Sequence, residues 1–148
     1  MEIRRFADAD LDEVLRLCRT EGYPTHAEDP ARALRALTAP GVTTVVADTG
    51  SALAGFAQMQ SDGEIQAHLS LIVVDPTQRR QGIARSMIET AFRLTGALRI
   101  DLVTDSADDF YRALPHIRMS GYRLYPDYSG PDRYRPGLVW KDGRPEDG

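Results

Sequence analysis

An apolar strand, a polar turn and the beginning of a helix follow one another in the stretch Leu71-Ile72-Val73-Val74-Asp75-Pro76-Thr77-Gln78-Arg79-Arg80-Gln81-Gly82-Ile83-Ala84. Pro76 ends the strand because proline cannot donate a hydrogen bond to a sheet. Beyond it, a helix is predicted from about Gly82 to Thr95, with Gly96 as its stop. Its apolar residues recur at helical spacing: Ile83, Met87, Ile88, Ala91 and Phe92. The stretch therefore predicts a turn at the N-terminus of an amphipathic helix.

This turn has the properties of a phosphate site. The first backbone N–H groups of a helix lack intrahelical partners and carry partial positive charge, so they can bind phosphate oxygens. Gly82 has no side chain to hold a pyrophosphate away from the backbone, and Ala84 is small. Arg79 and Arg80 add charge-assisted hydrogen bonds. The alternative is a solvated, arginine-rich turn, which a short motif alone does not exclude; the order strand, turn, helix favours the phosphate site.

Three successive strands are predicted on the N-terminal side of this turn. Runs rich in β-forming residues cover residues 43–47, 53–60 and 65–75. The polar turns between them, at residues 48–51 and 61–64, are short enough for antiparallel hairpins. The three strands therefore form a meander.

Further helices and strands flank the meander. Asp10 and Glu13 form an Asp-x-x-Glu helix start, and Asp29 before Pro30 is an N-cap with proline in the first turn. The strand after the central helix should lie parallel to the strand before Pro76, because a helix connects them. The remaining predicted elements are strands at residues 2–6, 98–104, 122–125 and 138–141 and helices at residues 10–22, 29–37 and 107–114.

This order predicts the α/β class in its layered α+β form, with a mixed, mostly antiparallel central sheet and helices on both faces. A chain of 148 residues with 42% hydrophobic and 27% charged residues fits one globular domain over residues 1–148. No segment is apolar enough for a membrane span or a signal peptide, so a cytoplasmic protein without a membrane partner is expected. The net charge of −4 argues against nucleic-acid binding. Whether the chain forms a homodimer stays open.

The lone cysteine and the histidines outside the sheet suggest no chemistry of their own. Cys18 lies on an apolar helical stripe and is interpreted as a buried structural thiol. His26 and His116 show no metal-ligand spacing with each other or with Cys18, so no metal is expected.

Two motifs together resemble the GNAT superfamily of N-acetyltransferases. The first is Val74-Asp75-Pro76 followed by Arg79-Arg80-Gln81-Gly82-Ile83-Ala84, which is similar to the family's acetyl-CoA motif. The second is Ala107-Asp108-Asp109-Phe110-Tyr111-Arg112-Ala113-Leu114, with Gly121-Tyr122 beyond it. The resemblance implies a GNAT-like fold, acetyl-CoA (coenzyme A) as co-substrate, and transfer of an acetyl or short acyl group to a primary amine of a small molecule or polypeptide by direct attack in a ternary complex.

The resemblance also implies roles for individual residues. Backbone groups of Ile72, Val73 and Val74 would pair with the pantetheine arm, and the turn at residues 79–84 would hold the pyrophosphate. Tyr111 would protonate the sulfur of coenzyme A; the alternative is a core aromatic residue beside Phe110. Thr104 stands where the family often has an asparagine that binds the cofactor.

The general base is the least determined part of the expected site. Many relatives have a glutamate at the position of Ser70, and serine cannot replace a carboxylate. By strand alternation, His68, Ser70, Ile72 and Val74 would share one face, so His68 could accept the proton directly or through water ordered by Ser70. A half-buried histidine bound to a neighbouring strand is an equal alternative. Asp101 and Glu64 are weaker candidates, since both are interpreted most simply as solvated charges.

Two departures from the family pattern keep other functions open. Residues 115–120 are an insertion before Gly121, which together with the loops at residues 23–26 and 127–136 could reshape the acceptor pocket. The missing carboxylate at Ser70 and this insertion leave a catalytically silent acyl-CoA-binding regulatory module as the alternative to an enzyme. A nucleotide-phosphate binder that uses the same turn is a third hypothesis.

Overall fold

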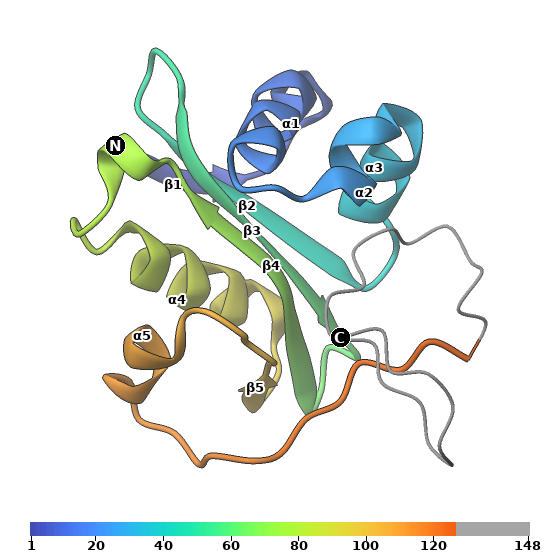
Figure 1. Ribbon diagram of the computed structural model, residues 1–148, viewed down its shortest axis with the longest axis vertical. Coiled ribbons are helices and arrows are strands. Elements are labelled where there is room, and N and C mark those ends of the chain that lie inside the picture. The colour runs from blue at the N-terminus through green and yellow to red at the C-terminus, as the bar shows by residue number, and fades with distance from the viewer. Residues whose placement is uncertain (127–148) are drawn as a thin grey trace, which may run out of the picture.

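The sheet has five strands in the order β1-β2-β3-β4-β5 (Figure 1) in this computed structural model, which describes residues 1–126. Neighbouring strands are antiparallel except β4 and β5, which are parallel. The predicted meander and the parallel pair across the helical connection are therefore confirmed. The strands are β1 (Glu2–Arg5), β2 (Val42–Asp48), β3 (Leu53–Ser61), β4 (Gln66–Val74) and β5 (Arg99–Asp101).

Helices lie on both faces of the sheet, as the sequence predicted. On one face lie α1 (Leu11–Thr20), α2 (Pro24–Glu28) and α3 (Pro30–Leu37); on the other lies α4 (Ile83–Thr95), with the short α5 (Asp108–Arg112) beside it (Figure 1). Short 3-10 turns precede α1 at Asp8–Asp10 and follow β4 at Pro76–Gln78. The mixed, mostly antiparallel sheet between helical layers is thus confirmed, while α2 was not predicted.

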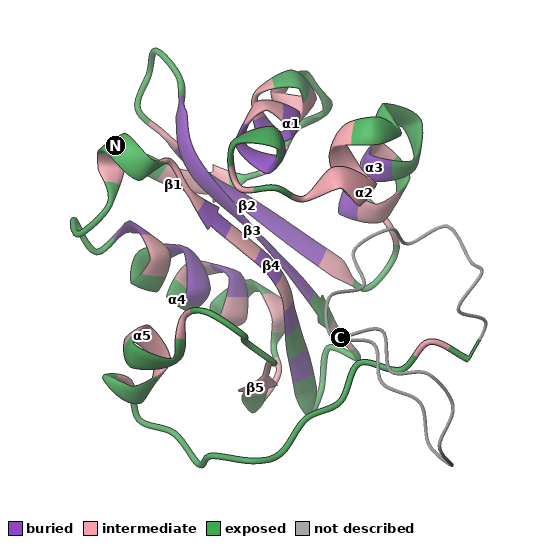
Figure 2. Ribbon diagram, in the orientation of Figure 1, coloured by how far each residue is buried: buried purple, intermediate pink, exposed green. Residues whose placement is uncertain are grey.

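Two apolar clusters hold these layers together, one on each face of the sheet (Figure 2). Met59, Leu69 and Met87 belong to the cluster under α4, whereas Leu17 and Phe56 belong to the cluster under α1 and α3. All five side chains are buried, and burial of large apolar side chains is the main favourable term in folding, at about 1.5–3 kcal/mol each.

Gly55 allows α4 to lie close to the sheet. A Cβ atom at this position would lie 2.5 Å from the Val73 carbonyl oxygen and 3.0 Å from Met87 Cε. Because a methyl group cannot fit at such distances, the contact between β3, β4 and α4 requires a glycine here.

The two predicted helix starts have different outcomes. The Asp10 carboxylate accepts hydrogen bonds from the Arg4 guanidinium at 2.8 and 2.9 Å and does not cap α1. The bonding predicted from Asp10 and Glu13 is therefore wrong, although the helix begins at the next residue. Asp29 caps α3 as predicted, since its carboxylate accepts the Arg32 N–H at 3.1 Å.

The elements after α4 are shorter than predicted. Strand β5 has three residues instead of the predicted 98–104, because it pairs with β4 over only three positions. The strand predicted at residues 122–125 is absent, and Tyr122 and Leu124 are 85% and 77% exposed; without a facing surface to cover, an extended segment gains little from strand pairing. The strand predicted at residues 138–141 and the loop at 127–136 lie outside the described residues.

Candidate functional site

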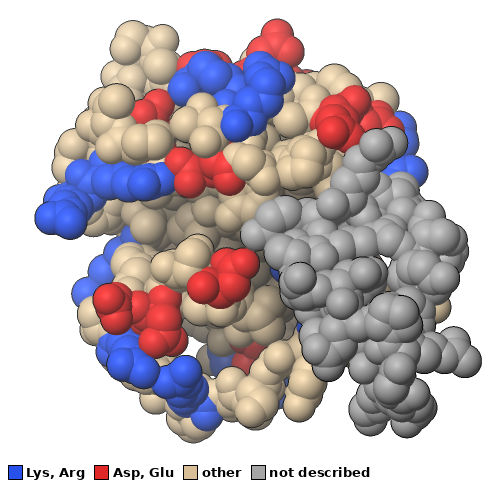
Figure 3. Space-filling view, viewed as in Figure 1, with Lys and Arg blue, Asp and Glu red and all other residues tan. Residues whose placement is uncertain are grey.

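The sheet opens between β4 and β5. The two strands pair only from Gln66 to His68 of β4, so among residues 1–126 no strand pairs with the rest of β4, up to Val74, on this side. Figure 3 shows a hollow in the surface between the part of the molecule that carries α1–α3 and the part that carries α4 and α5. The unpaired edge of β4 therefore lies beside a hollow in the surface.

Backbone groups of alternate β4 residues face this opening. The Asp75 N–H donates to the Ala54 carbonyl of the β3 side at 2.7 Å. In an antiparallel ladder every second residue bonds the same neighbour, so Val73 also faces β3, whereas Ile72 and Val74 direct their N–H and C=O groups to the open edge. Of the three strand residues expected to pair with a cofactor, Val73 is thus turned away.

The turn after β4 presents unbonded amides at the start of α4. Gly82 is the N-cap with φ +76°, a left-handed conformation that glycine adopts without strain. The first bond into the helix runs from the Ser86 N–H to the Gly82 carbonyl at 3.1 Å. Within residues 1–126, none of the backbone N–H groups of residues 81–85 donates a hydrogen bond. The expected group of free donors is therefore present at this helix start.

The two arginines of the turn differ in their surroundings. Arg79 Nη2 lies 2.5 Å from Glu21 Oε1, and Arg79 Nε donates to the Val74 carbonyl at 3.4 Å. Arg80 has φ +64° and, in the described part of the chain, neither an ion pair nor a hydrogen bond. Of these two arginines, Arg80 is thus the one whose charge has no partner among residues 1–126.

The other side chains of the predicted turn also differ in their burial and contacts. Ile83 is buried in the α4 cluster, so its side chain serves packing and only its amide is available. Ala84 is half-buried, and Gln81 is exposed and donates to the Gln78 side chain at 3.5 Å.

Tyr111 lies on α5 and packs inward rather than into solvent. Its ring meets Phe110 edge-on at a centroid distance of 4.9 Å and packs against the α4 cluster. Burial, and to a lesser extent the neighbouring Tyr23, raise the pKa of the Tyr111 phenol. Tyr111 therefore stays protonated at neutral pH and can act as a proton donor.

The sequence places Tyr23 only in a loop and does not predict its influence on Tyr111. It is the N-cap residue of α2, on the opposite face of the sheet from α5. No local pattern could reveal this electrostatic influence, because the two tyrosines lie far apart in the chain. On the α5 side, the Thr104 hydroxyl accepts the Ala107 N–H at 3.0 Å, so this residue supports the turn before α5.

A β-bulge interrupts β4 at Ser70. Gln58 of β3 opposes Leu71, but Met59, the next residue, opposes Leu69. Ser70 is therefore the extra residue, and a bulge of this kind reverses the alternation of side chains along the strand.

The bulge separates the residues that were expected to share a face. Ile72 and Val74 pack against the α4 cluster. Ser70 Oγ accepts a hydrogen bond from Gln60 Nε2 at 2.8 Å, and Gln60 directly opposes His68. His68 and Ser70 therefore lie on the α1–α3 face, and the expectation that they share a face with Ile72 and Val74 is wrong.

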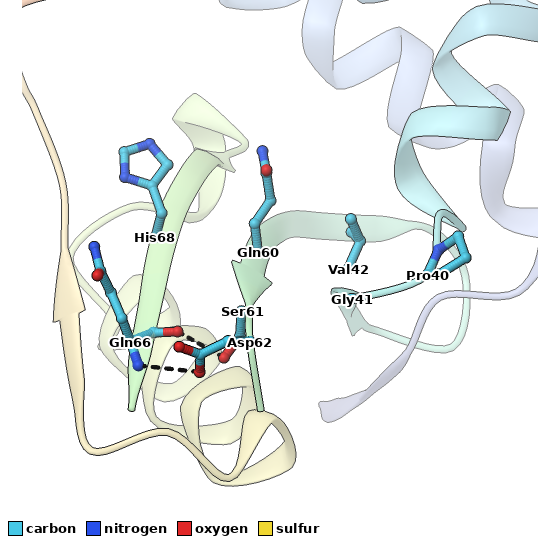
Figure 4. Close-up of a pocket in the computed structure, with 8 residues that line it drawn as sticks. All are labelled: Pro40, Gly41, Val42, Gln60, Ser61, Asp62, Gln66 and His68. Carbon is cyan, nitrogen blue, oxygen red and sulfur yellow. Dashed lines mark hydrogen bonds between the residues drawn. The ribbon is translucent and has the colours of Figure 1, made fainter. Parts of the chain in front are cut away.

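A polar depression lies on the α1–α3 side of the sheet, where β4 begins and β3 ends. The His68 and Gln60 side chains rise side by side from these strands (Figure 4). The Asp62 carboxylate accepts the N–H groups of Ile65, Glu64 and Gln66, which hold its pKa below the usual range, so it is anionic at neutral pH. The depression has a volume of about 360 Å³ and is lined by Pro40, Gly41, Val42, Gln60, Ser61, Asp62, Gln66 and His68.

The two weaker candidates for the general base are Asp101, which has a hydrogen-bond partner, and Glu64, which is exposed. Asp101 accepts a hydrogen bond from Gln66 Nε2 at 2.9 Å, and Glu64 is exposed in the preceding turn. His116 contacts the Leu114 carbonyl at 2.7 Å.

Among residues 1–126, no three side chains are grouped as a metal site would need. None of the helices in this part of the chain has the length and apolar content of a membrane span.

Comparisons with known proteins agree with this architecture. The structure resembles the aminoglycoside N-acetyltransferase AAC(6')-Iy in complex with CoA (22% identity, 83% of this chain and 93% of that chain, TM-score 0.67). It also resembles a ribosomal-protein-alanine N-acetyltransferase from Brucella melitensis (18%, 84% and 99%, 0.67) and a Trypanosoma brucei acetyltransferase (21%, 83% and 99%, 0.61). At these identities the likeness shows the fold. A search of curated proteins finds no match.

The sequence itself matches a family model. The acetyltransferase (GNAT) domain model covers residues 40–114, from just before β2 to just after α5, which is slightly more than half of the chain. This range includes the open edge of β4, the turn before α4 and Tyr111. The chain belongs to the GNAT acetyltransferase family.

Proposed function

We propose that this protein is an N-acetyltransferase that moves an acetyl or short acyl group from acetyl-CoA to a primary amine of a small molecule or polypeptide. The observation that carries the proposal is that the open edge of β4 leads directly into the turn whose free amides precede α4. A diphosphate binds well at a helix start, and the amides of a pantetheine arm can add to a strand edge. Coenzyme A has both groups in one molecule.

The cofactor contacts follow from this arrangement. The amides of residues 81–85 and Arg80 would bind the diphosphate, and the open-edge groups of Ile72 and the N–H of Val74 would bind the pantetheine arm. Thr104, on the α5 side, can still donate its hydroxyl hydrogen. The complex of AAC(6')-Iy with CoA supports the same type of cofactor in this fold.

The chemistry would proceed by direct attack. The neutral amine attacks the thioester carbonyl carbon, the carbon–sulfur bond breaks, and an N–H group of the β4 edge stabilises the oxyanion. Tyr111 gives its proton to the departing thiolate and is reprotonated from solvent. Since an alkylamine has a pKa near ~10 and is largely protonated at pH 7, a base must also take a proton from the acceptor.

The acceptor would approach along the α1–α3 face. His68, Ser70 and Gln60 share this face, and the polar depression with its anionic Asp62 attracts an ammonium group before reaction. We assign the proton from the amine to His68, either directly or through water bound to Ser70. Because Ser70 replaces a carboxylate, the silent acyl-CoA-binding module is kept as the second candidate function.

Binding and turnover separate the two candidates. Titration of the wild-type chain with CoA and with ATP by calorimetry should show binding of CoA and not of ATP. Thiol release from acetyl-CoA is then followed with a panel of amines that includes amino sugars, polyamines and peptides. Turnover with an amine supports the enzyme, CoA binding without turnover by any acceptor supports the silent module, and preference for ATP refutes both.

A further inference from the structure

Glu21 holds one of the two arginines of the cofactor turn. Its Oε1 atom lies 2.5 Å from Arg79 Nη2, and the two side chains are 26% and 50% exposed. The guanidinium is also fixed by its Nε bond to the Val74 carbonyl at 3.4 Å. Arg80, the adjacent residue, has no such partner among the described residues. The Glu21 carboxylate thus pairs with Arg79 at the place where a diphosphate would bind.

The position of Glu21 is determined by the end of α1. Its N–H donates to the Leu17 carbonyl at 3.2 Å, and the Tyr23 N–H donates to the Cys18 carbonyl at 2.9 Å. We call residues 21–23 the α1–α2 junction. The junction therefore contacts the turn through Glu21, and its Tyr23 is near enough to help raise the pKa of the Tyr111 phenol.

We propose that Glu21 is an internal competitor of the cofactor diphosphate, so that Arg79 must exchange the Glu21 carboxylate for phosphate when the cofactor binds. The inference rests on the proposed function, because it requires a diphosphate at this turn. Carboxylate and phosphate offer similar oxygen pairs to the planar guanidinium. A partly exposed ion pair contributes little to stability, so a doubly charged diphosphate displaces it at a small loss of affinity.

The exchange also connects cofactor binding to the α1–α2 junction. In the free protein the Glu21–Arg79 pair ties the junction to the turn after β4. Once Arg79 turns to phosphate, this tie is broken, and the N–H bonds of Gly22 and Tyr23 should open more often. Cofactor binding would then change the mobility of the chain next to Tyr111.

The test is a double-mutant cycle with CoA as the ligand. Glu21→Gln keeps the size of the side chain and removes its charge. We expect it to bind CoA about two- to fivefold more tightly in calorimetry, the range that corresponds to an exposed ion pair. The same gain should appear in an Arg80→Ala background and vanish in an Arg79→Ala background. An unchanged urea midpoint shows that the variants fold, and a merely structural role of Glu21 would not distinguish Arg79 from Arg80.

Hydrogen exchange supplies a second measurement. Saturating CoA should accelerate exchange of the Gly22 and Tyr23 amides in the wild type, whereas in Glu21→Gln these amides should exchange fast with or without CoA. Weaker or equal CoA binding by Glu21→Gln would overturn the inference and leave the proposed function intact. Failure of the wild type to bind CoA would overturn both.

Discussion

Gly82 offers the sharpest test of the phosphate turn, because three substitutions there separate backbone strain, bulk and charge. A Cβ atom at Gly82 would have no heavy atom within 4 Å, so added bulk meets no clash in the free protein. The left-handed φ of +76° costs a residue with a Cβ roughly 1–2 kcal/mol. Gly82→Ala, Gly82→Gln and Gly82→Glu should therefore all lower the free energy of unfolding by about 1–2 kcal/mol.

Their effects on cofactor binding should differ much more. A glutamate carboxylate about 5 Å from a diphosphate charge, in a medium with an effective dielectric constant near ~20, is repelled by about 3 kcal/mol. This energy corresponds to roughly a hundredfold loss of affinity. Gly82→Gln has the same length and backbone strain without the charge, so the ratio of its CoA affinity to that of Gly82→Glu isolates the electrostatic part.

Calorimetric titration with CoA and urea unfolding measure the two quantities independently. We expect Gly82→Ala to bind within about fivefold of the wild type, Gly82→Gln more weakly because of its bulk, and Gly82→Glu about a hundredfold more weakly than Gly82→Gln. If Gly82→Glu and Gly82→Gln bind CoA equally well, no diphosphate lies near this helix start, and the proposed cofactor site is wrong.

Three further outcomes follow from single residues. Tyr111→Phe should reduce turnover about 100-fold or more while the CoA affinity stays within about twofold; a wild-type rate of thiol release under conditions where chemistry limits would exclude Tyr111 as the acid. Gly55→Ala should lower the free energy of urea unfolding by about 1–3 kcal/mol, because its Cβ would lie 2.5 Å from the Val73 carbonyl oxygen of β4, and a loss below about 0.5 kcal/mol would contradict this close contact with the β4 backbone. Burial raises the pKa of the Cys18 thiol from 9.0 to about 11, so its contribution to stability is fully present below pH 9.0 and is lost as the pH rises towards about 11; Cys18→Ala should lack this decline, and equal pH profiles would show that Cys18 does not cause it.

Much of the fold could be predicted because its signals are local. Pro76 and Gly96 mark ends that depend on the conformations of single residues, and the spacing of apolar residues in α4 depends only on the helical repeat. The phosphate turn was found for the same reason, since it needs a strand, a glycine and a helix in that order. The Asp29 cap before Pro30 was likewise contained in two adjacent residues.

The predictions that failed concern strand registers and contacts between segments that are distant in the chain. Ser70 has no chemical feature that marks a β-bulge, yet the extra residue moved His68 to the opposite face from Ile72. The pairing of Arg79 with Glu21 and the nearness of Tyr23 to Tyr111 join segments that only the folded sheet brings together. A strand pattern reports that a strand exists and leaves its register undetermined.

The open edge of β4 explains why the candidate site lies where it does. Within a sheet, the N–H and C=O groups of a strand normally bond both neighbours, and unpaired groups inside a protein are unfavourable. Here β5 leaves β4 after His68, so the groups of Ile72 and the N–H of Val74 keep their capacity to bond something other than the protein's own sheet, while the Val74 carbonyl accepts a hydrogen bond from Arg79. In the observed register, a β5 that continued to residue 104 would reach only Leu71 of β4, so the end of the strand would stay open even with the longer β5. In the proposed function, this divergence of β5 from β4 would leave room beside β4 for the diphosphate, the pantetheine arm and the proton donor together.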